Sequence, residues 1–156
     1  LKTIPGGENT SIDRMMNETA SRETYRIKGE TVITVDDYTS GRVFEDALSY
    51  SFYPIDLHDE NGVKPRYLRP GMVPTIPRSA LIPKGSKNIM VAGRSVSSDR
   101  LANSAARVQA SCMGMGQAAA VTATLAAQLK VTPAEVPLAK IHEALKQHQA
   151  IVPQMA

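Results

Sequence analysis

The sequence predicts an α/β chain in which a mixed sheet is flanked by helices, and three observations lead to this prediction. Residues 88–93, NIMVAG, form an apolar run that is typical of a strand buried on both faces. After a serine-rich loop, residues 111–129 form a helix-length run composed mainly of small residues. A final amphipathic helix has its stripe at Leu138, Ile141 and Leu145.

The sequence of the N-terminal third predicts short helices and strands. The lead-in mixes turn formers with polar residues, with one short helix near residues 11–18. Residues 25–35, YRIKGETVITV, are β-branched and roughly alternating, which predicts a strand that bends at its glycine. Asp36 and Asp37 are good helix caps, so a short helix or turn should begin after one of them and lead to a strand at 49–58.

Proline shapes the segment that follows. Five prolines fall between residues 59 and 83, and because proline cannot donate to a ladder, we expect edge strands and ordered loops there. Further along, TPAE at residues 132–135 has a cap, a proline at the first helical position and an acid that closes a capping box. This motif predicts the start of the terminal helical region.

Composition excludes several classes of protein. The 156 residues are enough for one domain, are 42% hydrophobic and 21% charged, and contain no apolar run near the ~20 residues of a membrane span. The net charge of +3 comes from scattered Lys and Arg, and aromatic residues make up 4%, so nucleic-acid binding is not expected. The chain begins at Leu1 instead of Met and shows no signal pattern, so we expect a fragment or processed product whose targeting segment is not visible, with the cytoplasm as the default.

The start of the small-residue helix is a candidate binding site. A helix N-terminus offers backbone N–H groups and the positive end of the helix dipole to an anion or a partly negative ring. Gly114, Gly116 and the neighbouring alanines would let a flat ligand approach the backbone. They would equally let the helix pack closely on a sheet, and both interpretations remain open.

Other reactive residues suggest little by themselves. Cys112 excludes an internal disulfide, and it is either a thiol whose pKa is lowered by the helix N-terminus or an inert thiol packed among small residues. The three histidines are too far apart for a zinc site, so no metal is expected. Glycine motifs for dinucleotide phosphates are missing. Five arginines have the forked geometry that binds carboxylates or phosphates, but each also suits a structural role: Arg22, Arg26, Arg94, Arg100 and Arg107.

Longer stretches carry a resemblance. Residues 83–128, PKGSKNIMVAGRSVSSDRLANSAARVQASCMGMGQAAAVTATLAAQ, strongly resemble the C-terminal segment of the FAD-dependent oxidoreductase family. The segments SRETYRIKG, YPIDLH and TIPRSALIPKGSKN, together with the closing helices, agree with that family in the same order. The match extends from about Ser21 onward, with Ala120 and Ser95 standing where the family often has glycine and cysteine.

The resemblance implies a fold and a set of residue roles. The chain would be the C-terminal part of a two-domain FAD-binding flavoprotein fold, α+β as a fragment, lacking the N-terminal dinucleotide-binding half. Its divisions would be substrate-domain strands at 1–86, a flavin-capping strand, loop and helix at 87–130, and a helical tail at 131–156. Contacts to the flavin would come from Ala92, Gly93, Arg94, Arg107, Ser111, Cys112, Met113 and Gly114, with Arg22 and Glu23 on the substrate side.

The implied function is oxidation or reduction of a small organic substrate with FAD as cofactor. The helix N-terminus would point at the pyrimidine side of the flavin and stabilise negative charge there. The upstream half of the same protein would be the main partner, a homo-oligomer is compatible with the pattern, and the isolated chain would be inactive. The alternative is a non-catalytic interaction module, whose incomplete sheet would expose an apolar face and strand edges to a partner.

Overall fold

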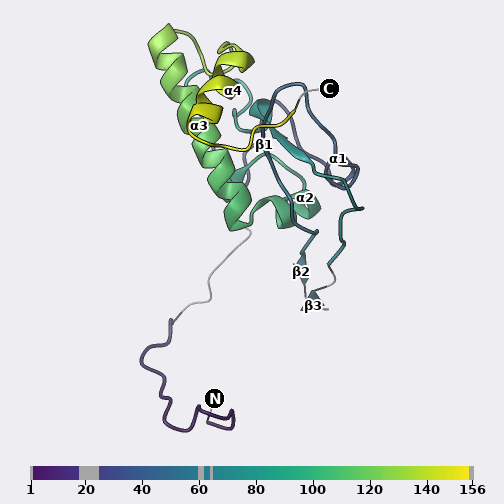
Figure 1. Ribbon diagram of the computed structural model, residues 1–156, viewed down its shortest axis with the longest axis vertical. Coiled ribbons are helices and arrows are strands. Elements are labelled where there is room, and N and C mark those ends of the chain that lie inside the picture. The colour runs from purple at the N-terminus through teal and green to yellow at the C-terminus, as the bar shows by residue number, and fades with distance from the viewer. Residues whose placement is uncertain (1, 18–24, 60–61, 64, 155–156) are drawn as a thin grey trace.

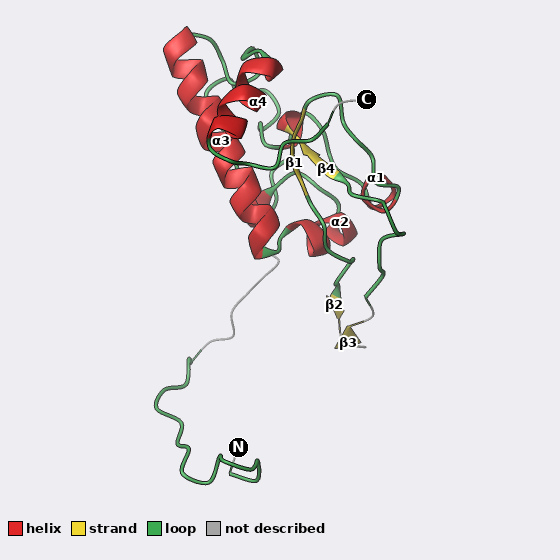
Figure 2. Cartoon of the chain, in the orientation of Figure 1, coloured by secondary structure: helices red, strands yellow, loops and turns green. Residues whose placement is uncertain are grey.

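The computed structural model describes residues 2–17, 25–59, 62–63 and 65–154. Figures 1 and 2 show a body with the long helix α3 along one side, α4 packed against it and two short antiparallel sheets. This combination of helices with small antiparallel sheets is the α+β fold expected of a fragment. The elements are α1 (Val35–Thr39), β1 (Ala47–Tyr50), β2 (His58–Asp59), β3 (Gly62–Val63), β4 (Thr75–Pro77), η1 (Arg78–Ala80), η2 (Gly93–Ser95), α2 (Arg100–Ala106), α3 (Gln109–Leu129) and α4 (Leu138–Gln147).

The two sheets lie at the positions where strands were expected, but they are shorter. β1 pairs antiparallel with β4 and places Ser49 opposite Ile76, with a register irregularity one step earlier. The predicted strand at 49–58 therefore begins two residues earlier, at Ala47, and its ladder ends at Tyr50. Beyond Tyr50, Ser51 N–H donates to Pro74 O at 2.9 Å, but Pro74 has no N–H to return a bond, which explains the early end. β2 and β3 form a separate small hairpin.

The predicted strand at 25–35 is an extended segment that shares its hydrogen bonds between two neighbours. Ile27 and Ile33 donate to the carbonyls of Ser95 and Ser97, whereas the N–H groups at 30 and 31 donate to carbonyls at 82 and 79. A continuous ladder with either neighbour does not form, and isolated bridges remain. Gly29 permits the close packing, because a Cβ there would lie 2.8 Å from the Cβ of Ser97.

Two expectations about the N-terminal helices were wrong in detail. Residues 11–17 contain no helix, since their few apolar side chains have no core surface to cover. α1 does form, but its cap is Thr34, whose hydroxyl accepts from Asp37 N–H while the Asp37 carboxylate accepts from Thr34 N–H. The acid is thus the third residue of a capping box, which satisfies two donors reciprocally.

The prediction of a central buried strand at 88–93 was wrong for the described chain. Residues 88–92, here called the open segment, carry no strand assignment, and Ile89 is 57% exposed. Val91 N–H donates to Leu81 O at 2.7 Å, but no described strand pairs with the segment. An apolar strand is buried only when neighbouring strands cover it, and the described residues provide none.

The serine-rich loop contains a helix that the sequence reasoning missed. α2 is capped by Asp99, whose carboxylate accepts from Ala102 N–H at 2.8 Å. Its residues from Ala102 to Ala106 are buried. The alanines allow this short helix to pack closely against the body, and Ser104 among them accepts from Asp56 N–H and donates to Leu101 O.

The two C-terminal helices follow the sequence pattern closely. α3 begins two residues before the expected start, and it ends at Lys130, which takes a left-handed conformation with φ 57°. α4 buries Ile141 and Leu145 as predicted. The Thr132 and Glu135 side-chain bonds exist, but they close a separate turn, and α4 begins only at Leu138.

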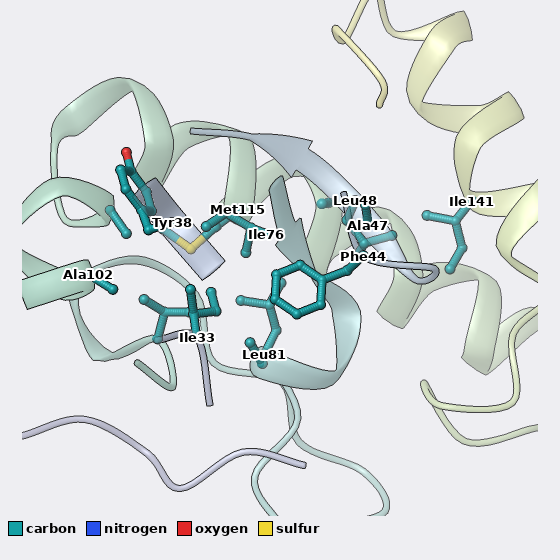
Figure 3. Close-up of a cluster of buried hydrophobic side chains, with 14 of the residues drawn as sticks. Ile33, Tyr38, Phe44, Ala47, Leu48, Ile76, Leu81, Ala102, Met115 and Ile141 are labelled. Carbon is teal, nitrogen blue, oxygen red and sulfur yellow. The ribbon is translucent and has the colours of Figure 1, made fainter. Parts of the chain in front are cut away.

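The core lies between β1, β4 and α3. Figure 3 shows Tyr38 and Met115 meeting Ile76 at the centre, while Ile141 from α4 approaches Leu48 from the far side. All five of these side chains are at most 1% exposed. The first half of α3 is therefore held rigidly against β1, and this contact positions the helix N-terminus beside η2.

Candidate cofactor-facing surface

η2 forms a tight turn directly beside the first turns of α3. Gly93 opens this turn with φ +81°, a conformation that L side chains rarely adopt. A Cβ built on Gly93 would lie 3.8 Å from the Sγ of Cys112. The turn thus lies close to the helix without a steric clash. Glycine is required at position 93 by the positive φ, since an added Cβ would make only an ordinary van der Waals contact.

The N-terminus of α3 has free hydrogen-bonding capacity. Its N-cap is Val108, so no side chain caps the helix, and the first turn contains no acidic residue. Gln109 and Ala110 are exposed. The N–H groups of a first helical turn have no partner within the helix, and they coincide with the positive end of the dipole. This end of α3 suits a group that carries negative charge.

Cys112 lies on the side of α3 that faces η2. Its thiol donates to the carbonyl of Arg107 with a sulfur-to-oxygen distance of 3.2 Å. Burial raises the pKa of this thiol, and the positive charge of Arg94 opposes the shift without cancelling it. The structure therefore favours the inert, packed thiol over a thiolate activated by the helix N-terminus.

Ser111 points the other way, into the body. Its hydroxyl lies 2.8 Å from that of Ser51, which in turn lies 3.0 Å from the phenol oxygen of Tyr38. The Tyr38 hydroxyl donates to Tyr53 O at 3.1 Å. This chain of buried hydroxyls ties α1, β1 and α3 together. The Ser111 side chain is accordingly used for structure.

Met113 and Gly114, although adjacent in the sequence, lie in different surroundings. Met113 is 72% exposed, whereas Gly114 faces β1, where an added Cβ would meet the Cβ of Ser49 at 3.4 Å. The glycine at 114 thus serves the close helix-on-sheet packing that was one of the two interpretations. Gly116 has no atom within 4 Å of its ideal Cβ position.

The predicted arginines also differ from one another in the groups that they contact. Arg94 is exposed on η2, and its backbone carbonyl accepts from the side-chain amide of Asn103 at 3.2 Å. Arg107 ends α2 and donates to Asp56 O at 3.3 Å, while Arg26 donates to Ser98 O. Arg22 and Glu23, the predicted substrate-side pair, lie outside the described residues.

Asn103 is the residue near this surface that sequence reasoning missed. It is 1% exposed, and besides Arg94 O its amide also donates to the hydroxyl of Ser98. It therefore fixes η2 to α2. A signal was present in the sequence, because an asparagine inside an alanine-rich run is an unfavourable helix residue that needs a partner.

The structure brings η2 against the first turns of α3, and several of the predicted cofactor residues belong to these two elements. We call this subset the η2/α3 face: Ala92, Gly93, Arg94, Cys112 and Met113, with the N-terminus of α3. Ser111, Gly114 and Arg107 lie behind it and hold it in place. The donors, the positive charge and the apolar Met side chain together suit a flat, partly negative ring.

Beside η2, the structure therefore presents a helix N-terminus without a side-chain cap or an acidic first turn. A family model described as FAD dependent oxidoreductase matches residues 1–145. Because this match covers most of the 156 residues, the chain belongs to the FAD-dependent oxidoreductase family, whose cofactor is FAD. Comparison with curated proteins gives no match, and comparison with solved structures gives none either.

The part of the chain that the structure describes contains neither a membrane-spanning helix nor a metal-binding cluster. None of its helices has both the length and the apolar character needed to cross a bilayer. Across residues 2–17, 25–59, 62–63 and 65–154, no cluster of His, Cys, Asp and Glu side chains is suited to hold a metal ion.

Proposed function

We propose that the η2/α3 face is this chain's contribution to the flavin site of an oxidoreductase that acts on a small organic molecule. The observation that carries the proposal is the uncapped N-terminus of α3 beside the left-handed Gly93 turn. When bound, FAD supplies the hydride chemistry, and the protein supplies binding, orientation and electrostatics.

Each part of the face has a task in this proposal. The first N–H groups of α3 and the Arg94 guanidinium stabilise negative charge on the bound ring, an effect that is strong where water is excluded. Gly93 allows the backbone to approach the ring, because it presents no side chain. Met113 covers the ring with an apolar, adaptable surface.

We further propose that the open segment pairs with a dinucleotide-binding half lying upstream. The segment carries Ile89, Met90 and Val91 and pairs with no described strand, so it can be completed as a strand by pairing with another one. In this arrangement residues 1–86 belong to the substrate side, 87–130 cap the flavin and 131–156 form a tail. The isolated chain then binds FAD weakly and lacks activity.

The proposal is tested by measuring the Kd for FAD from its visible absorption, with this chain alone and with the upstream coding segment co-expressed. A flavin band is expected in the second case. Met113→Glu places a negative charge on the η2/α3 face, and it should weaken FAD binding about tenfold, the equivalent of ~1.4 kcal/mol. Gln117→Glu is the matched control, because it adds the same charge one turn later on an exposed position.

Equal losses in the two variants would show that the face does not contact the flavin. If the longer protein stays colourless with added FAD, the interaction module becomes the better interpretation. The exposed Ile89 is the observation that favours that alternative.

A further inference from the structure

A second concave surface lies away from the η2/α3 face, between the C-terminal end of α1 and residues 66–72. It is a cleft of about 480 Å³. Its lining is polar and charged: Asp36, Thr39, Ser40, Arg66, Tyr67, Arg69 and Met72. None of these residues belongs to the η2/α3 face, so this cleft stands independently of the flavin proposal.

The wall at 66–72 is shaped by its backbone. Arg66 exchanges two hydrogen bonds with Ile55, at 2.9 and 3.0 Å, which form an isolated antiparallel bridge. Met72 N–H then donates to Arg69 O at 3.0 Å across Pro70 and Gly71, where Gly71 has φ +81°. Proline followed by a glycine of positive φ is the signature of a type II turn. The backbone positions of both arginines are therefore fixed.

The two walls are joined by a close contact. Gly41, just after α1, has φ +71°, and a Cβ there would lie 3.1 Å from both the Cβ and the Sδ of Met72. Nearby, Thr75 N–H donates to Arg42 O at 3.2 Å. Because no side chain stands between Gly41 and Met72, the wall at 66–72 docks directly on the end of α1, and the cleft is preformed.

The wall at 66–72 carries hydrogen-bond donors, the guanidinium groups of its two arginines. The ion pairs of the described residues join Arg42 to Asp37 and His58 to Asp56, so the guanidiniums of Arg66 and Arg69 take part in neither. Both arginines are exposed to the solvent of the cleft. Two guanidiniums on one wall offer forked donors that match a carboxylate.

The wall formed by α1 carries hydrogen-bond acceptors, a carboxylate and two hydroxyl oxygens. Asp36 is exposed and contributes a carboxylate, whereas the neighbouring Asp37 is already paired with Arg42 at 2.7 Å. The hydroxyls of Thr39 and Ser40 donate to helix carbonyls at 2.8 and 3.2 Å. Their hydrogens are thus used, and each oxygen keeps lone pairs that can accept a hydrogen bond from a ligand.

From this division we propose that the cleft binds a small organic acid that also carries a hydrogen-bond donor, such as an ammonium group, away from its carboxylate. The carboxylate lies against Arg66 and Arg69, and the donor lies against Asp36 and the two hydroxyls. A bare anion uses one wall and is repelled by Asp36. The opposite polarity of the two walls is what selects the ligand.

The test is an NMR titration of the isotopically labelled chain with 4-aminobutyrate and with butyrate. Saturable shifts of the amides at 36–40 and 66–72 are expected for 4-aminobutyrate, with butyrate binding about tenfold more weakly because it lacks the ammonium group. Arg66→Gln and Arg69→Gln should each weaken 4-aminobutyrate about tenfold. Arg14→Gln, which removes the same charge from an exposed arginine outside the cleft, should leave its Kd unchanged.

Asp36→Asn provides the second arm, because it should remove the preference for 4-aminobutyrate over butyrate. The proposal is overturned if neither probe gives saturable shifts in the cleft, or if Arg14→Gln weakens binding as much as the cleft variants. Tighter binding of butyrate or inorganic phosphate than of 4-aminobutyrate would also overturn it, since the cleft would then be a site for bare anions. These measurements need no flavin, so their outcome is separate from that of the FAD titration.

Discussion

Two segments that carry large apolar side chains, residues 75–82 and the open segment at 88–92, differ in how deeply they are buried. Ile76 and Leu81 in the first segment are completely buried, whereas Ile89 in the second is 57% exposed. The first segment pairs with β1 and also accepts hydrogen bonds from the residues at 30–31. The second has no pairing strand among the described residues. Whether a segment with apolar side chains is buried therefore depends on the segments that pair with it, and its composition alone does not decide its burial.

The largest expected effect comes from truncating matched isoleucines in the two segments. Ile76→Ala removes a fully buried side chain, and it should lower the free energy of unfolding by about 2–5 kcal/mol. Ile89→Ala should change it by about 0.5 kcal/mol or less, as exposed positions do. Urea unfolding of both variants measures the difference. Similar losses would mean that the open segment is packed in solution.

A second prediction concerns the chain of buried hydroxyls that runs from Tyr38 through Ser51 to Ser111. Ser51→Ala removes the group that links Tyr38 to Ser111, and it should cost about 1–3 kcal/mol, because buried polar groups lose a partner. Ser86→Ala, in the turn just before the open segment, should stay within about 0.5 kcal/mol of the parent. Thermal unfolding followed by circular dichroism compares the two. An unchanged melting temperature in Ser51→Ala would show that this chain of buried hydroxyls adds nothing to stability.

A third, smaller effect is a loss of stability at high pH. Burial raises the pKa of the Tyr38 phenol above its ordinary value near 10.0, and the bonds to Ser51 and Tyr53 oppose this shift only partly. The folded state thus holds the proton more tightly than the unfolded state, so the contribution is complete below pH 10 and is lost as the pH rises through the folded pKa.

Urea unfolding between pH 8 and pH 11 measures this dependence. Tyr38→Phe should flatten the decline above pH 10, although it lowers stability at neutral pH by removing the hydroxyl. The exposed Tyr25 supplies the control, because Tyr25→Phe should leave the slope intact. An unchanged slope in Tyr38→Phe would place the high-pH loss elsewhere.

The smallest expected effect is a gain. Gly116→Ala meets no atom within 4 Å and replaces a helical glycine, so it should stabilise the chain by about 0.5–1 kcal/mol. Gly93→Ala should destabilise it, because φ +81° strains any L side chain. Urea unfolding again provides the measurement. A gain at position 93 would show that the η2 turn changes conformation readily, which would weaken the case for a preformed face.

The sequence predicted those elements whose cause is local. α4 was found from its stripe and α3 from its length and composition, since both depend on residues a few positions apart. α2 was missed because the serines just before it resemble a loop, and its Asp99 cap was the better signal. The open segment was misjudged because strand burial depends on a partner distant in sequence or absent from the described residues.

The candidate site shows the same limit. Residue type and order indicated a cluster around η2 and the start of α3, and the structure brings Gly93 and Cys112 together there. Which face of α3 each side chain occupies depended on packing against β1, so the inward direction of Ser111 was not predictable from the motif. The Arg66 and Arg69 cleft was missed altogether, because it needs a type II turn to dock on a glycine about thirty residues earlier.

The bonds that join residues 26–33 to residues 95–99 have a consequence for synthesis on the ribosome. Arg26 and Ser98 are 72 positions apart, and Gly29 and Ser97 are 68 apart. At about 5–20 residues per second, the earlier segment waits roughly 4–14 s for its partner to be translated. During that interval its backbone donors are open to solvent and to chaperones, so the segment at 26–33 cannot acquire its final pairing until residues 95–99 have been made.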